Sequence, residues 1–83
     1  MDKKEHIKIY GTSWCGATQR VVSFLNSRKI SFDFIDIDND RKGEEFVKKA
    51  NNSYRSVPTI VLSNGSILVE PSEIELSKYL IND

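Results

Sequence analysis

The turn Ser63-Asn64-Gly65-Ser66 places the tightest limit on what this 83-residue chain can fold into. Asn-Gly between two β-rich runs is the strongest short-range signal for a β-hairpin. The flanking runs, Thr59 to Leu62 and Ile67 to Val69, are therefore predicted to pair as antiparallel strands. The fold must contain a sheet with an antiparallel part.

The N-terminal half of the chain alternates strand and helix patterns. Ile7 and Ile9 alternate with other residue types, and Phe32 to Ile37 is rich in aromatic and β-branched residues, so both segments are predicted strands. Between Gly16 and Arg28 the apolar residues recur at helical spacing, which predicts a helix with one buried face. These residues are Ala17, Val21, Phe24 and Leu25.

Two further helices are predicted. One runs from about Asp40 to Ala50, with Asp38 or Asp40 as its cap. Its expected buried residues are Phe46, Val47 and Ala50. The segment Ser72-Glu73-Ile74-Glu75 has the form of a capping box and opens a last helix that ends near Leu80.

The predicted element order is βαβαββα. Strands separated by helices imply a parallel pair with a right-handed crossover, and the hairpin adds an antiparallel pair to the same sheet. The expectation is an α/β fold with a four-stranded mixed sheet flanked by helices. Residues 1–83 are expected to form one domain, because the chain is too short for two.

The composition narrows the classes of partner. Twelve basic residues balance twelve acidic ones, so no global field attracts nucleic acid or an anionic membrane. No apolar run approaches the roughly 20 residues that span a bilayer. The N-terminus leads into a strand pattern without the apolar segment of a secretory signal, so a cytoplasmic location is expected.

Cys15 is the only cysteine, so it forms no internal disulfide and no thiolate-rich zinc site. A lone cysteine is often a small buried hydrophobe. At a helix start, however, unpaired N–H groups and the helix dipole favour the thiolate and lower the pKa of Cys15. The one histidine, His6, lies at the far end of the first strand, which argues against a Cys-His catalytic pair.

Two motifs together resemble the glutaredoxin family. They are Thr12-Ser13-Trp14-Cys15-Gly16-Ala17-Thr18 at a strand-helix junction and Arg55-Ser56-Val57-Pro58-Thr59 before the hairpin. Among its members the chain is most similar to the small actinobacterial mycoredoxin type. The resemblance implies a thioredoxin-like fold with Cys15 as the nucleophile and Trp14 as a wall of the site. It also implies a cis Val57-Pro58 bond, although local sequence favours trans, and a Val57 backbone that pairs with the bound thiol.

The chain departs from the family at the position of the second cysteine, where it has Thr18. Without a resolving thiol, the remaining chemistry is monothiol exchange with mixed disulfides. Thr18 is expected either to hydrogen-bond to the Cys15 sulfur or to cap the first helical turn. Gly16 and Thr18 would then support the nucleophile without contacting substrate.

Other departures bear on the small thiol. Thr12 stands where glutathione-binding members carry a lysine, and Glu70-Pro71-Ser72 replaces the usual Gly-Gly. Both changes weaken the case for glutathione. Arg55 is either a partner for a carboxylate of the thiol or a solvated surface residue. The N–H groups of Ser72 and Glu73 could receive a second carboxylate, which Glu70 and Glu73 would oppose.

The sequence thus predicts a monomeric thiol-disulfide oxidoreductase without a permanent cofactor. Its co-substrate would be a low-molecular-weight thiol such as glutathione or mycothiol, and its partners protein mixed disulfides. Two alternatives stay open. Members with Cys-Gly-Phe-Ser carry a glutathione-dependent [2Fe–2S] cluster, and Cys15-Gly16 matches half of that motif. A redoxin-fold domain that binds a partner without chemistry would also accommodate Thr18.

Overall fold

The computed structural model describes residues 7–80 and contains the seven predicted elements in the predicted order. They are β1 (Ile7–Gly11), α1 (Gly16–Ser27), β2 (Phe32–Asp36), α2 (Arg41–Ala50), β3 (Thr59–Val61), β4 (Ile67–Val69) and α3 (Glu73–Tyr79). The strands β2 and β3 each end one residue earlier than expected. His6 lies outside the described residues.

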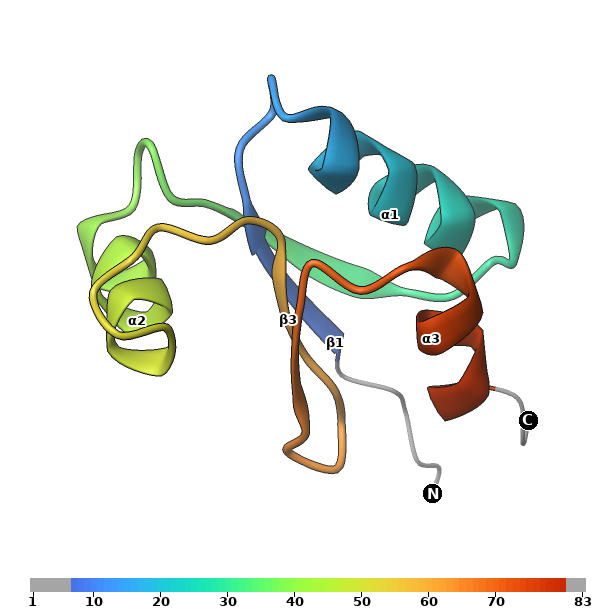
Figure 1. Ribbon diagram of the computed structural model, residues 1–83. Helices are drawn as coiled ribbons and strands as arrows, with labels where there is room; N and C mark the ends of the chain where they lie inside the picture. The colour runs from blue at the N-terminus through green and yellow to red at the C-terminus, as the bar shows by residue number, and fades with distance from the viewer. Residues whose placement is uncertain (1–6, 81–83) are drawn as a thin grey trace.

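The four strands form one mixed sheet in the order β2-β1-β3-β4 (Figure 1). β1 pairs in parallel with β2, with Ile9 opposite Phe34, and antiparallel with β3, with Ile9 opposite Ile60. The hairpin between β3 and β4 closes as predicted, with Gly65 at a φ of 93° in the region that favours glycine. The mixed α/β sheet is thus confirmed.

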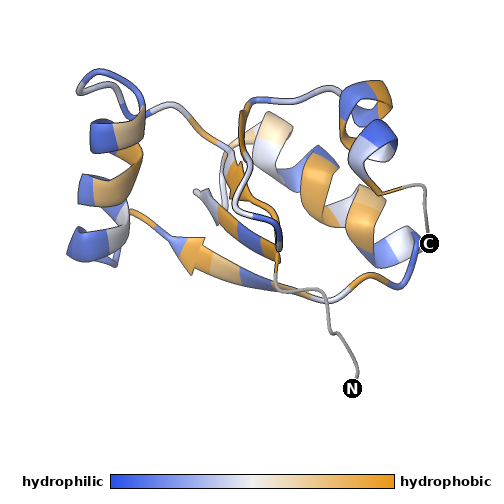
Figure 2. Ribbon diagram, turned by 90° about the horizontal axis from the view of Figure 1, so that it is seen from below, coloured by the Kyte–Doolittle hydropathy of each residue, from blue (hydrophilic) through white to orange (hydrophobic). Residues whose placement is uncertain are grey.

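Helices cover both faces of the sheet. Figures 1 and 2 show α1 and α3 on one face and α2 on the other. The main core lies under α1 and α3, and its fully buried side chains come from the central strands and from these helices. They include Ile7, Ile9, Leu25, Ile60 and Leu76.

The core between the sheet and α2 is smaller than the core under α1 and α3. The ring of Tyr10 stacks on Phe46 with centroids 4.6 Å apart, and Val47 is fully buried. Asp40 is the cap of α2, because its carboxylate accepts a hydrogen bond from the Gly43 amide at 2.9 Å. The prediction that Ala50 is buried was wrong: as the last residue of α2, next to the turn at Asn51, it is exposed.

Within residues 7–80, none of the helices is both long and apolar enough to cross a membrane.

Candidate active site around Cys15

The Cys15 thiol lies at the first turn of α1, in the loop that leaves the central strand β1. Cys15 is the N-cap residue of α1, with extended backbone angles, and its side chain is half-buried. The loop is held by hydrogen bonds from the Cys15 amide to the Thr12 carbonyl at 3.3 Å and from the Gln19 amide to the Cys15 carbonyl at 3.0 Å. The thiol therefore stands at the helix start, as predicted, where N–H groups lack helical partners.

The helix start lowers the pKa of Cys15 below its ordinary value. The backbone amide of Thr18 contributes most, and the Thr18 hydroxyl and Ala17 amide act in the same direction. Burial of the sulfur and the negative charge of Glu70 oppose them. The neutral thiol makes no capping hydrogen bond, so these donors act on the thiolate. A larger fraction of Cys15 is thus thiolate at neutral pH than in an unperturbed cysteine.

Thr18 is placed directly behind the thiol. Its side chain is 1% exposed and packs against Gly11, where an added Cβ would lie 2.7 Å from both Cγ2 and Oγ1 of Thr18. Its hydroxyl has no hydrogen-bond partner within residues 7–80. Because a buried hydroxyl without a partner is costly, the Cys15 thiolate is the acceptor that this donor serves.

An exposed network of hydrogen bonds borders the thiol on the side of α2. The Trp14 indole N–H donates to Asp38 at 2.8 Å, and Arg55 donates to the other oxygen of Asp38, also at 2.8 Å. The Arg55 Nε forms a second ion pair with Glu44 at 2.8 Å. Arg55 and Trp14 both lower the pKa of Asp38, Arg55 more strongly. We call Trp14, Asp38, Arg55 and Glu44 the Arg55 network; it ties the Cys15 loop to α2 and to the loop before β3.

The loop before β3 contains a cis peptide bond between Val57 and Pro58. Pro58 is buried, and its carbonyl accepts a hydrogen bond from the Glu70 amide at 2.8 Å, so this loop is fixed to the end of β4. The N–H and C=O of Val57 have no backbone partner in the described chain. They are free to pair with an extended ligand.

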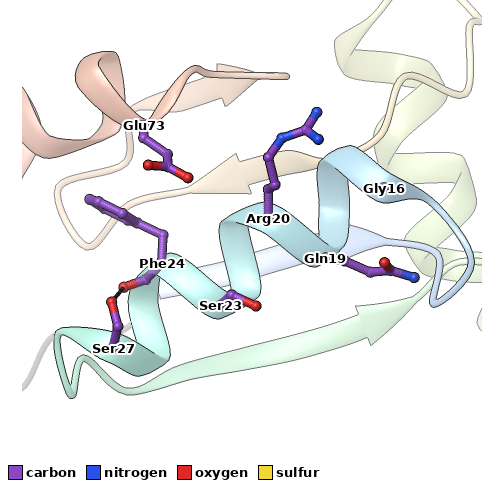
Figure 3. Close-up of a pocket in the computed structure, with 7 residues that line it drawn as sticks. All are labelled: Gly16, Gln19, Arg20, Ser23, Phe24, Ser27 and Glu73. Atoms are coloured by element: carbon purple, nitrogen blue, oxygen red, sulfur yellow. Dashed lines mark hydrogen bonds between the residues drawn. The ribbon is translucent and has the colours of Figure 1, made fainter.

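A cleft runs between α1 and α3. It is lined by residues that include Ala17, Arg20, Glu70, Ser72, Glu73 and Ile74, and we call it the α1/α3 cleft. A second hollow continues from it along α1, with Gly16 and Glu73 on its walls. Figure 3 shows Arg20 and Phe24 on the side of α1 that faces α3, with the Glu73 carboxylate directed toward them. Ala17, two positions after Cys15, is the lining residue of the α1/α3 cleft nearest to it along α1.

Comparisons with known proteins agree with this geometry. A glutaredoxin family model matches residues 7–67. A glutaredoxin-like protein of Mycobacterium tuberculosis is 39% identical over 75 residues, which span 90% of this chain and 89% of that protein. The chain belongs to the glutaredoxin family. Glutaredoxins are thiol-disulfide oxidoreductases, so the enzyme class predicted from the sequence is confirmed.

Further relatives and solved structures agree with this assignment. Mycoredoxin 1 of Corynebacterium glutamicum is 32% identical over 71 residues, covering 86% of this chain and 87% of that protein. The crystal structure of a glutaredoxin from Archaeoglobus fulgidus superposes with a TM-score of 0.77 at 26% identity, over 92% of this chain and 86% of that one. A thioredoxin-like protein with a TM-score of 0.80 and 22% identity, covering 93% and 96%, supports the fold alone.

The positions predicted from the sequence fall into two groups. Trp14 precedes Cys15 in its loop and is 66% exposed. Val57 and Pro58 lie in the loop before β3, and the pairing of Tyr10 with Thr59 places that loop at the same end of the sheet as the Cys15 loop. Thr12 differs from expectation, since its side chain is 1% exposed and faces the interior instead of a ligand. The Ser72 hydroxyl is also occupied, because it caps α3 by accepting from the Glu75 amide at 3.0 Å.

Arg55 lies on the surface, as one of the two expectations had it, but its guanidinium already holds the carboxylates of Asp38 and Glu44. The sequence analysis missed this role of Asp38, which it considered only as a helix cap. The position of Asp38, two residues after β2, could have indicated this role. Because β2 is parallel to β1, their carboxyl ends meet at one edge of the sheet, so the residues after β2 lie near the Cys15 loop.

Proposed function

We propose that this glutaredoxin is a monothiol exchange enzyme that releases small thiols from protein mixed disulfides. Within residues 7–80 Cys15 is the only sulfur nucleophile, and Thr18 fills the position of a resolving cysteine. The observation that carries the proposal is the placement of Cys15 at the start of α1, with the Thr18 amide and hydroxyl lowering its pKa.

The reaction takes two balanced exchanges. The Cys15 thiolate attacks the small-thiol sulfur of a mixed disulfide, a new S–S bond to Cys15 forms, and the protein substrate leaves as a thiolate. A second molecule of the small thiol, as its thiolate, then attacks the small-thiol sulfur of this bond. The symmetric disulfide of the small thiol forms and leaves, and the Cys15 thiolate is restored. One disulfide enters and one leaves, so the second thiolate supplies all the reducing power and no permanent cofactor takes part.

The proposed site residues act around this sulfur. The Val57 backbone would pair with the extended part of the bound disulfide, and Trp14 would border it. Ser72 and its neighbours would line the space for the rest of the small thiol, whereas Gly16 and Thr18 would support the thiolate. One Cys15 suffices, so we propose that the monomer is active. The exchange needs a reduced thiol pool, which favours the cytoplasm.

The test uses a reporter peptide joined to 2-mercaptoethanol through a disulfide, with excess 2-mercaptoethanol as reductant. The wild-type chain should accelerate release of the peptide thiol, and Cys15→Ser should abolish the acceleration. Intact-mass measurement should show one mercaptoethanol adduct on the wild-type chain only. Equal rates for the two chains, or no acceleration by either, would reject catalysis and leave a binding role.

A further inference from the structure

The inference concerns the charge of the small thiol and rests on the proposed function. Two charged regions border Cys15: the Arg55 network and the α1/α3 cleft. In the Arg55 network, Asp38 and Glu44 both contact Arg55 at 2.8 Å. Glu44 also pairs with Lys48 at 3.8 Å, so two cationic side chains balance the two carboxylates in this region, and Arg55 is already paired.

The α1/α3 cleft, in contrast, has more carboxylates than cationic side chains on its walls. Arg20 lines it together with Glu70 and Glu73. The backbone of Glu70 is fixed by its hydrogen bond to the Pro58 carbonyl, so its side chain starts beside the loop that borders Cys15. Glu73 is directed into the space between α1 and α3 (Figure 3). The negative charge of Glu70 reaches the sulfur itself, since it acts to raise the pKa of Cys15.

We infer that Cys15 selects disulfides by charge: it reacts fastest when the small-thiol half is cationic, more slowly when it is neutral, and slowest when it carries a carboxylate. The carboxylates of Glu70 and Glu73 outnumber Arg20 in the cleft where we place that half, and Arg55 is already paired with Asp38 and Glu44. Each reaction is the first exchange described above: the bond to Cys15 forms, the S–S bond of the reagent breaks, and one thiolate leaves. The substrate class is therefore a thiol without a free carboxylate near its sulfur.

The experiment measures single-step exchange of the reduced chain with three symmetric disulfides. They are cystamine, which is cationic, hydroxyethyl disulfide, which is neutral, and dithiodipropionate, which is anionic. Rates of adduct formation on Cys15 are followed by intact mass and divided by the rates of the same reagents with 2-mercaptoethanol. At low salt the normalised rate for cystamine should exceed that for dithiodipropionate about tenfold or more, as expected for charge steering near a site.

High salt and substitutions of the charged residues test whether charge causes this preference. In 1 M salt, where the screening length is about 3 Å, the preference should fall to within about threefold. The double variant Glu70→Gln, Glu73→Gln should reduce it at low salt, whereas Glu45→Gln, the same change on the exposed surface of α2, should leave it intact. Arg20→Gln should increase it. Because each variant is compared across reagents, a general change in thiol reactivity cancels.

The outcomes separate the inference from the function on which it rests. If none of the reagents reacts faster with the chain than with 2-mercaptoethanol, the monothiol exchange itself fails. If all react but dithiodipropionate matches or exceeds cystamine, the exchange stands and the charge selection is overturned, with Arg20 as the dominant charge. A preference that persists unchanged in the Glu70→Gln, Glu73→Gln variant would also overturn it, because those carboxylates are its stated cause.

Discussion

The inner and the outer side of Cys15 are built from different kinds of groups. On the inner side, toward β1, the sulfur meets the amide and hydroxyl of Thr18, whose side chain is 1% exposed and packs against Gly11. On the outer side, Asp38 and Arg55 form an ion pair at 2.8 Å, but their side chains are 37% and 38% exposed. One side is buried and neutral, and the other is charged and solvated.

This difference separates two functions that a charged active site often combines. Neutral donors at a buried position are not screened by salt, so their effect on the pKa of the thiol should not change with salt concentration. Exposed ion pairs contribute little stability and weaken with salt, but they fix geometry when their hydrogen bonds are short. We therefore expect the inner side to control the reactivity of Cys15, and the outer side to hold Trp14 and the loop before β3 in place.

The largest effect should come from a methyl group added to the inner side. Gly11→Ala would place a Cβ 2.7 Å from the Thr18 side chain. Because overpacking a buried contact costs about 1–3 kcal/mol, urea unfolding should shift to lower denaturant concentration, and the displaced Thr18 should leave Cys15 less reactive. The matched control is Gly16→Ala, since a Cβ there meets nothing within 4 Å and its stability should not fall. Equal stability of the two variants would show that Thr18 is loosely packed.

Removing only the hydroxyl should have a smaller effect, confined to chemistry. Thr18→Val keeps the shape and the backbone amide, which contributes most to the low pKa, but it loses the side-chain donor. The pKa of Cys15 should rise, and alkylation at pH 7 should slow about threefold as the thiolate fraction falls. The midpoint of the pH profile of alkylation measures the shift directly.

The stability of Thr18→Val provides a control for this interpretation. An unpartnered buried hydroxyl is replaced by a methyl group, so Thr18→Val should unfold at the same or a higher urea concentration. Thr18→Ser retains the donor and should keep the low pKa. If Thr18→Val alkylates like the wild-type chain at every pH, the hydroxyl does not act on the sulfur, and the backbone amide alone accounts for the shift.

The inner side could largely be anticipated from the sequence, and the outer side could not. Helical spacing and the strand-turn-helix junction place Cys15 at the start of α1 without any knowledge of the tertiary fold. The interior position of Thr12 was missed because it depends on how the Cys15 loop turns over β1. Local sequence also favours a trans Val57-Pro58 bond, and only the family resemblance pointed to the cis form that the structure has.

Arg55 shows why the outer side escaped prediction. Its partners Asp38 and Glu44 are 17 and 11 positions away in the chain and come from the loop after β2 and from α2. Charge patterning along a sequence identifies pairs within one helix, such as Glu44 and Lys48, but not pairs that form when loops meet above a sheet.

The smallest effect should come from acid, and it should be limited to the outer side. Because Arg55 and Trp14 lower the pKa of Asp38 from 3.8, its ion pair is fully present above that pH and is lost as the pH falls through the lower, native value. The fluorescence of Trp14, the only tryptophan, should therefore stay constant from pH 7 down to about pH 4 and change only below it, while the chain remains folded by circular dichroism. Asp38→Asn should remove this transition and give the acid spectrum at pH 7, with little change in the alkylation rate of Cys15. A transition centred above pH 4, or a large loss of Cys15 reactivity in Asp38→Asn, would show that the two sides are coupled and that the outer network also tunes the thiol.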